Sequence, residues 1–312
     1  MKAAIINEYG DSDKLQIQDV PKPKIDTLDV LIRVHAAGIN PVDTKVRQGA
    51  MHKILAILFP KILGAECAGV VEEVGLMITD LQPGDRVVAS LGTFGDGYAE
   101  YAVAKDKNVV KLPDDIDFIQ AAAMPVAAGT ALQALRDKGH LRPFDRVLIN
   151  GASGGVGTFA VQIAKILGAH VTAVCSADSA PMVRHLGADQ VIDYHTTDFT
   201  KLADDIFEVV FDAVGKSSFD ECRNILTAEG TYVTTIPSPK HVLEEVVSAF
   251  EKQKSELIMF NFTKEDMNWL LKQVSEGKLV PVIDRTYPLR EVSTAHTYCE
   301  TGHVKGKLVL TI

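Results

Sequence analysis

The sequence predicts an α/β protein with two domains: a doubly wound parallel sheet in the middle of the chain and a barrel-like β domain formed by both ends. Three observations carry this prediction. Apolar strands alternate with helices from about residue 147 to 262, β-branched runs broken by Gly and Pro fill residues 1–108, and β texture returns over 281–312. At 312 residues the chain also exceeds the size at which one core stops growing.

The N-terminal part has the short β-branched runs and turn residues of an antiparallel β domain. Its predicted strands are Val30–Ala36, Gly69–Val74, Arg86–Ser90 and Ala99–Val103. After Pro113 the chain becomes Ala-rich, which predicts helices over Phe118–Met124 and Gly129–Lys138 with Pro125 as a break between them.

The middle of the chain alternates strands with helices such as Val156–Leu167 and Pro181–Leu186. The predicted strands are Val147–Asn150, Val171–Cys175, Val191–Asp193, Val209–Ala213, Thr231–Ile236 and Leu257–Phe262. Six short apolar strands of this kind are typical of a parallel sheet covered on both faces. The last stretch, Pro281–Ile312, shares the β texture of the N-terminal part, so we place it in the first domain, which becomes discontinuous.

The composition argues against several partners. The net charge is −9 without a long basic run, so nucleic acid and anionic membranes are not expected partners. The start MKAAIINEYG has no leader-like pattern, and no apolar run is long enough for a membrane span, which predicts a cytoplasmic protein. No metal is expected, because the cysteines occur singly and without a histidine at ligand spacing. They are Cys67, Cys175, Cys222 and Cys299.

The strongest local signal is the segment Val147–Gly157, VLINGASGGVG, in which an apolar strand runs through glycines directly into an amphipathic helix. Gly154 would let the backbone approach the phosphates of a dinucleotide, and Gly157 would let the helix pack closely on the strand. Ala152 stands where the usual fingerprint has its first glycine. Because a helix N-terminus offers free N–H groups and a partial positive charge, we expect a dinucleotide diphosphate here.

The same segment leaves a serine hydrolase open as an alternative. Residues 151–155, GASGG, satisfy the G-x-S-x-G pattern of a nucleophile elbow with Ser153 as the nucleophile. The additional glycines are not needed in an elbow, and the sequence singles out no later Asp and His as partners. The hydrolase is therefore the less favoured interpretation.

The end of the following strand bears on which nicotinamide cofactor binds. An enzyme that uses NAD typically has a carboxylate there for the ribose 2′-OH, whereas this chain has Ser176. Ser176 and Ser179 would donate to a 2′-phosphate, and Arg184 and Tyr194 are close enough in sequence to contribute. Asp178 argues for NADH, unless it is only an acidic residue favoured at a helix N-terminus. Arg184 could instead be a solvent-exposed helix residue without a role in binding. We expect NADPH.

Six segments, in order along essentially the whole chain, carry a family resemblance. They are AGINPVDTKVRQG (37–49), LGAECAGVVEEVG (63–75), LQPGDRV (81–87), GASGGVGTFAVQIAK (151–165), LGADQVIDY (186–194) and FDAVG (211–215). The chain resembles the medium-chain dehydrogenase/reductase superfamily, in its quinone oxidoreductase and 2-alkenal reductase branch. The resemblance implies a Rossmann doubly wound parallel sheet domain over 123–262. It also implies a discontinuous GroES-like β-barrel catalytic domain over 1–122 and 263–312.

The resemblance also bears on metal binding. Zinc-dependent members of the superfamily carry a Cys where this chain has Asn40 and a His where it has Ala65, and no cluster of four cysteines follows Gly92. Glu66 remains, but one carboxylate does not make a zinc site, so its expected role is structural.

The resemblance implies individual site residues. Asn40 would lie at the nicotinamide ribose, and Lys45, in the pattern N-P-x-D-x-K, would touch the cofactor; these two are the expected catalytic residues. Lys45 has the alternative of being an ordinary surface lysine. Met51 and His52 begin the apolar run 51–60, which would line a substrate pocket unless it is ordinary core. The remaining expected cofactor-binding residues are Thr130, Ala152, Ser153, Gly154, Gly155, Val156, Ser176, Ser179, Arg184, Tyr194, Ile236, Phe260, Asn261 and Phe262.

These expectations describe a zinc-free reductase that transfers hydride from NADPH to quinones or to the C=C bond of α,β-unsaturated carbonyl compounds. Besides the hydrolase, a non-catalytic NADPH-binding protein, similar to crystallin-like relatives of the family, stays open as an alternative. The open edge of the last strand and the resemblance favour a homodimer.

Overall fold

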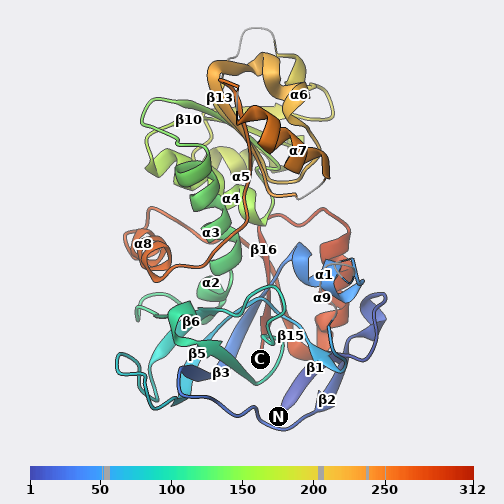
Figure 1. Ribbon diagram of the computed structural model, residues 1–312, viewed down its shortest axis with the longest axis vertical. Helices are drawn as coiled ribbons and strands as arrows, with labels where there is room; N and C mark the ends of the chain where they lie inside the picture. Colours follow the sequence, from blue (N-terminus) through green and yellow to red (C-terminus); the bar gives the residue numbers. More distant parts are fainter. Residues whose placement is uncertain (51, 53–56, 203–206, 237–238, 250) are drawn as a thin grey trace. The chain divides into compact units, whose positions relative to one another are not determined.

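The computed structural model describes residues 1–312 except 51, 53–56, 203–206, 237–238 and 250, and leaves out the side chains of 239–243. Contacts divide the chain into two compact units (Figure 1). The first consists of Met1–Val126, Phe262–Gly277 and Pro281–Ile312, and the second of Ala127–Asn261 and Lys278–Val280. Both ends of the chain thus belong to the first unit. The expected domain limits, 122 and 263, lie close to this division and stay a prediction.

Six parallel strands form the sheet of the second unit. In spatial order they are β11 (Gln190–Asp193), β10 (His170–Cys175), β9 (Arg146–Asn150), β12 (Phe207–Asp212), β13 (Leu226–Thr234) and β14 (Lys254–Leu257). β9, β10 and β12 are buried along most of their length, as expected for a sheet covered on both faces. The chain order reverses between β9 and β12, and ligands of such sheets bind beyond the carboxyl ends of the strands at this point.

The helices that accompany this sheet are mostly short. They are α3 (Pro125–Gln133), α4 (Gly155–Ile166), α5 (Ala180–His185), α6 (Phe219–Cys222) and α7 (Pro239–Ser248). A π-helical turn, Ala134–Lys138, continues α3. Phe207, Phe219 and Tyr232 belong to the apolar core of the unit.

Two predictions for this part of the chain are wrong in detail. Two separate helices are present as predicted, but the second, α3, begins at Pro125 and not at Gly129, because proline is tolerated in the first turn of a helix. The strand predicted over 257–262 is β14, which ends at Leu257. Beyond it the side-chain amide of Gln133 bonds both the carbonyl and the N–H of Asn261, at 2.6 and 3.2 Å. These bonds occupy backbone groups that a longer strand would use for pairing.

The described residues of the first unit form two sheets, and among their strands only β15 and β16 pair in parallel. The larger sheet has the order β15 (Ile283–Pro288), β16 (Lys307–Thr311), β3 (Asp29–Ile39), β5 (Glu66–Val74), β6 (Arg86–Ser90) and β8 (Val109–Lys111), with β7 (Tyr101–Lys105) also paired to β3. The smaller sheet has the order β2 (Gln16–Asp19), β1 (Lys2–Ile6) and β4 (Lys61–Ile62). The antiparallel β domain predicted from the N-terminal pattern is therefore present.

In the part of this unit that the structure describes, the helices are α1 (Pro41–Arg47), α2 (Phe118–Ala122), α8 (Lys264–Ser275) and α9 (Val292–Glu300). The strand-like pattern does not predict α1 or α9. Pro41 and the bond from the Asn40 N–H to the Asp43 carboxylate, at 2.8 Å, start α1. α9 forms because one of its faces, with Val292 and Ala295, packs into the β core.

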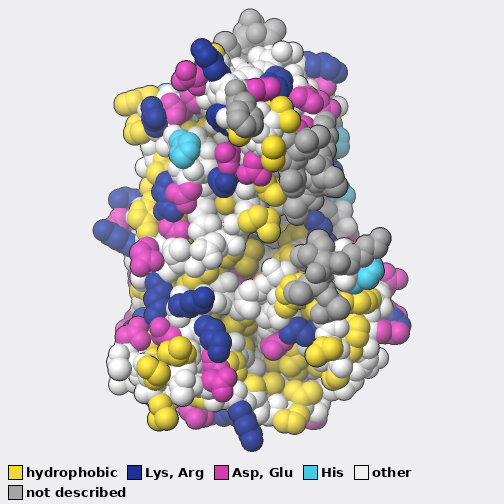
Figure 2. Space-filling view, in the orientation of Figure 1, with side chains coloured by type: hydrophobic (Ala, Val, Ile, Leu, Met, Phe, Trp, Pro, Cys, Tyr) yellow, Lys and Arg dark blue, Asp and Glu magenta, His cyan; other side chains and the backbone are white. Residues whose placement is uncertain are grey.

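The surface agrees with the mixed charge pattern of the sequence. On the face drawn in Figure 2, Lys and Arg side chains are interspersed with Asp and Glu. Among the helices that the structure describes, none has the length and hydropathy needed to cross a membrane.

Candidate functional site

The turn between β9 and α4 has the geometry that its glycines predict. Gly151 adopts φ +78°, in the left-handed region that glycine enters without strain. The N–H groups of Gly151 and Ala152 both donate to the carbonyl of Val174 in β10, at 3.1 and 3.0 Å. These bonds anchor the turn to the sheet. The N–H of Ala152, expected at the cofactor, is thus already engaged, and the buried Ala152 shapes the turn.

Gly154 and Gly157 have different steric roles. A Cβ on Gly157 would lie 2.1 Å from the Gly151 oxygen and 2.7 Å from the Ala152 Cα, so only glycine lets α4 pack against the turn. A Cβ on Gly154 would meet only the Gly151 oxygen, at 3.5 Å, which is an ordinary contact. The outer side of Gly154 is therefore open.

The start of α4 can hold an anion. The first N–H groups of a helix have no partner within it, and residues 153–156 at this start are partly exposed. Among the residues described, no hydrogen bond joins the Ser153 hydroxyl to a histidine, which the hydrolase alternative requires. The turn thus offers backbone donors for a diphosphate.

A buried aspartate that the sequence analysis missed organises the loop after β12. Asp212 is fully buried, and its two oxygens accept six hydrogen bonds of 2.7–3.1 Å. The donors are the Asn150 amide, the N–H groups of Val214, Gly215 and Ser217, and the hydroxyls of Ser217 and Tyr232. Val214 packs on Gly151, where a Cβ would lie 2.5 Å from Val214 Cγ1. Asp212 therefore fixes a loop that borders the glycine turn.

The residues expected at the 2′-phosphate gather at the end of β10, with one exception. The hydroxyl oxygens of Ser176 and Ser179 lie 3.2 Å apart, and Ser176 is the more accessible of the two. The N–H of Tyr194 donates to the carbonyl of Cys175, the last residue of β10, at 3.3 Å. Arg184 lies instead on the exposed side of α5.

Residues expected near the nicotinamide lie along α3. Thr130 is buried in that helix, and its neighbour Gly129 packs on the Phe260 ring, where a Cβ would lie 2.2 Å from Cε2. Gln133, one turn further, holds the backbone of Asn261. The structure therefore brings Thr130, Phe260 and Asn261 to the same helix.

Ile236 and Phe262 lie elsewhere. Ile236 packs on Gly215, where a Cβ would lie 2.3 Å from Ile236 Cγ1, and so belongs with the loop that Asp212 fixes. Phe262 begins a segment of the first unit.

In the first unit, Asn40 is part of a buried polar cluster with Glu66 and Lys307. Glu66 Oε1 accepts from Asn40 Nδ2 at 2.7 Å and from Lys307 Nζ at 2.9 Å, while Oε2 accepts from the Val126 N–H at 2.7 Å. These contacts agree with the structural role expected of Glu66. Lys307 is a residue that the sequence analysis missed, because only the pairing of β16 with β3 brings it to Asn40.

Lys45 and Asn40 have different environments on α1. Asn40 precedes the helix and is buried, whereas Lys45 lies in its last turn and is exposed. His52 is also exposed, and its Nδ1 lies 2.6 Å from the Gly49 oxygen. Met51, expected to line the substrate pocket with His52, lies outside the described residues.

Other buried polar groups surround α1. Burial raises the pKa of Asp43 to about 7, although bonds from the Asn40 N–H and from the Tyr98 hydroxyl, at 2.8 and 2.9 Å, favour the charged form. Burial, together with the charge of Arg47, lowers the pKa of His296 to about 3. Arg47 is fully buried and paired with Glu300. These contacts are consistent with Asp43 and Arg47 ordering the segment after β3.

The cysteines are free thiols, and three of the four are buried. Burial raises the pKa of Cys67 and of Cys222 to about 12, so neither readily forms the thiolate that metals bind. Within the described part of the chain, no group of three or more His, Cys, Asp or Glu side chains is arranged to hold a metal ion.

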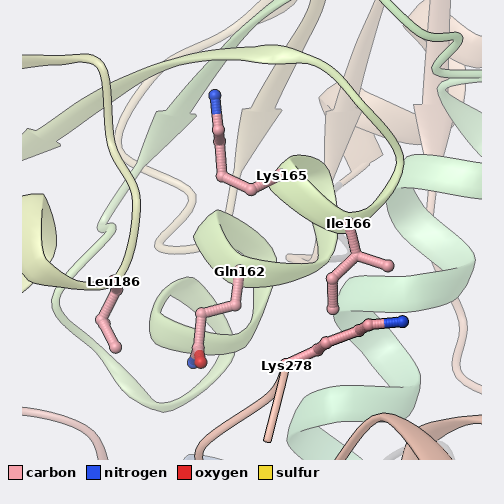
Figure 3. A pocket seen from close by; sticks show the side chains of 5 residues that line it. All are labelled: Gln162, Lys165, Ile166, Leu186 and Lys278. Carbon is pink, nitrogen blue, oxygen red and sulfur yellow. The ribbon is translucent and has the colours of Figure 1, made fainter. Parts of the chain in front are cut away.

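A pocket of about 370 Å³ in the second unit is separate from these residues. It is lined by Gln162, Lys165, Ile166, Leu186 and Lys278 (Figure 3). It borders the C-terminal half of α4, whereas the diphosphate is expected at the start of that helix. None of the expected site residues lines it.

Comparisons with known proteins agree with this architecture. The family "Alcohol dehydrogenase GroES-like domain" matches residues 26–114, and "Zinc-binding dehydrogenase" matches residues 186–310. A chloroplast envelope quinone oxidoreductase homolog of Arabidopsis thaliana is 34% identical over 99% of this chain and 98% of its own. An NADPH-dependent alkenal/one oxidoreductase of the same plant, named chloroplastic, is 34% identical over 99% of this chain and 79% of its own.

A solved structure shows the same fold. The quinone oxidoreductase from Coxiella burnetii is 35% identical, covers 100% of this chain and 99% of its own, and superimposes with a TM-score of 0.93. The prediction of a doubly wound parallel sheet with a discontinuous GroES-like domain is confirmed. The chain belongs to the medium-chain dehydrogenase/reductase superfamily, in its quinone oxidoreductase branch.

Proposed function

We propose that this chain is an oxidoreductase that uses NADPH to transfer hydride to quinones or to the C=C bond of α,β-unsaturated carbonyl compounds, without zinc. The observation that carries the proposal is the accessible start of α4 at the switch point of a six-stranded parallel sheet. The activities named for the Arabidopsis and Coxiella relatives support the same class of reaction.

Residues of the second unit would hold the cofactor. The N–H groups of Gly155 and Val156 would bind the diphosphate. The diphosphate could come close to the backbone because one side of Gly154 is open. Ser176, with Tyr194 beside it, would receive the 2′-phosphate. No carboxylate stands at Ser176, where an NAD enzyme would bind its ribose, and this absence favours NADPH over NADH.

When bound, NADPH would supply hydride from C4 of its nicotinamide ring. Thr130 and the backbone around Phe260 would orient that ring, and Asn40 would hold the adjoining ribose. Lys45 would stabilise the negative charge that develops on the carbonyl oxygen of an enone, or donate a proton to the product. A quinone needs no acid from the protein, because the oxygens of its hydroquinone can take protons from water.

The residues around Glu66 do not fit a zinc ion. Zinc in proteins prefers Cys, His and carboxylate ligands, and Asn40 and Ala65 supply neither a thiolate nor an imidazole. The one carboxylate oxygen that faces Asn40 already accepts from the Lys307 ammonium at 2.9 Å. The proposed reaction therefore uses no metal ion.

Two further expectations stay predictions. One is a homodimer, for which β14 offers an open strand at the end of its sheet. The other is a cytoplasmic location. Sedimentation of the purified protein and imaging of the tagged chain would test them.

The experiment that tests the proposal is an acceptor screen with NADPH and NADH in parallel. Quinones and short enals should accelerate NADPH oxidation, NADPH should be preferred over NADH, and chelators should change neither rate. If NADPH binds but no quinone or enal accelerates its oxidation, the substrate half of the proposal is wrong. If chelation abolishes the activity, the metal-free half is wrong.

A further inference from the structure

The ammonium of Lys307 is buried among three acceptors. The side chain, at the start of β16, is 3% exposed. Its Nζ donates to Asn40 Oδ1 at 2.5 Å, to Glu66 Oε1 at 2.9 Å and to the Ile39 carbonyl at 3.2 Å. An ammonium has three N–H donors, so every one of them is used. Lys307 is thus held in one place and has no donor left for a substrate.

These bonds fix the carboxamide of Asn40 in one orientation. Its oxygen faces the Lys307 ammonium, and its nitrogen donates to the Glu66 carboxylate at 2.7 Å. A flipped amide would place its NH₂ group against the ammonium and its oxygen against the carboxylate, so both contacts would become repulsive. The pair of charges therefore decides which end of the amide faces which way.

The fold is shaped to accept this cluster. Leu308 pairs with Ile39 across antiparallel strands, which puts Lys307 beside Asn40. Gly38 makes room for the carboxylate, because a Cβ there would lie 2.1 Å from Glu66 Oε1. Glu66 is fully buried, and a buried carboxylate needs a counter-charge. Lys307 supplies it.

We propose that Lys307 is a positioning residue for the reaction: it holds the Asn40 carboxamide in the orientation that cofactor and substrate require, while balancing the charge of Glu66. This rests on the proposed function, in which Asn40 serves the nicotinamide ribose. If Lys307 only balanced the charge of Glu66, its role would be structural and not one of positioning Asn40. The two roles separate when both charges are removed together.

The experiment compares Lys307→Met with the double variant Glu66→Gln/Lys307→Met. Lys307→Met leaves a buried carboxylate alone, so both Tm and kcat should fall. The double variant has no unpaired charge and should regain most of the lost Tm. Its kcat should stay at least about tenfold low, because a misplacement of about 1 Å near the reacting atoms can cost about 100-fold. NADPH affinity should change less than kcat, since the diphosphate is held elsewhere.

A matched control is Lys264→Met, in the same unit. Lys264 pairs with Asp80 and Asp106, at 3.2 and 3.1 Å, outside the cluster. Its loss should leave kcat unchanged, whatever it does to Tm. If the double variant regains kcat along with Tm, or if Lys307→Met keeps both, Lys307 does not position Asn40.

A readout without substrate separates this inference from the proposed function. In NMR spectra of the cofactor-free protein, the Asn40 side-chain amide should give two resolved protons protected from exchange, and Lys307→Met should remove the protection. Fast exchange in the unsubstituted protein would overturn the inference even if the enzyme reduces quinones. Protected protons with no activity toward any acceptor would leave the cluster as described and refute the function.

Discussion

Replacing Gly154 by Ala tests whether the turn before α4 lets its backbone approach a diphosphate. The added methyl group would meet only the Gly151 oxygen, at 3.5 Å, and the backbone at φ −81°, ψ 179° suits alanine. Ala in place of Gly at a helix N-cap costs about 0.5–1 kcal/mol. Such a loss lowers the Tm of a chain of this size by only about 1–4 °C.

The effect on NADPH should be much larger. The methyl group would stand on the open side of the turn, where the phosphates are expected, and would displace at least one charge-assisted hydrogen bond. Such a bond contributes about 2 kcal/mol, which is roughly 30-fold in Kd. Isothermal titration of NADPH into the variant measures this loss directly, and differential scanning calorimetry measures its Tm.

Gly157→Ala is the matched control. In contrast to Gly154→Ala, its main effect should be on Tm. Its Cβ would lie 2.1 Å from backbone, and overpacking at the upper end of the usual range costs about 3 kcal/mol, or about 6–12 °C in Tm. If Gly154→Ala binds NADPH as tightly as the unsubstituted protein, the phosphates do not approach this glycine. If Gly157→Ala keeps its Tm, the steric account of the turn is wrong.

Three further predictions concern individual side chains, two of them buried. Asp212→Asn should destabilise the second unit by about 3 kcal/mol, because an amide NH₂ would face donors that now bond a carboxylate. The substitution should also weaken NADPH binding. Thermal unfolding with and without NADPH checks both effects. Because burial raises the pKa of Asp43 from 3.8 to about 7, its contribution to stability is complete below about pH 4 and is lost as the pH rises to about 7. Asp43→Asn should therefore flatten the dependence of Tm on pH across that window, and an unchanged slope would contradict the assignment. Ser153→Ala should leave NADPH oxidation within about threefold, and labelling of Ser153 by a fluorophosphonate would instead favour the hydrolase.

Local patterns predicted most of the fold. The six strands of the second unit and helix α4 follow from apolar runs of strand length and from the glycines before a helix, which depend on neighbouring residues only. α9 was not predictable in this way, because its helical face is defined by a β core far away in sequence. The strand predicted through Phe262 failed for the same reason, since Gln133 takes the backbone of Asn261.

The candidate site divides along similar lines. The close packing at Gly157 and the open side of Gly154 were predictable because both depend on residues within one turn. Asn40 is expected at the site from a family resemblance. Its partner Lys307 was not predicted, because 267 residues separate the two and only strand pairing joins them. Asp212 ends an apolar strand, FEVVFD, so the sequence suggests that it is buried. Its role in fixing the following loop becomes visible only when its hydrogen-bond donors are known.

A crystal structure of the chain with NADPH would show whether the turn before α4 holds the diphosphate. We expect diphosphate oxygens within hydrogen-bond distance of the N–H groups of Gly155 and Val156, and the 2′-phosphate beside Ser176. A cofactor bound away from the start of α4, with that turn empty, would refute this binding mode.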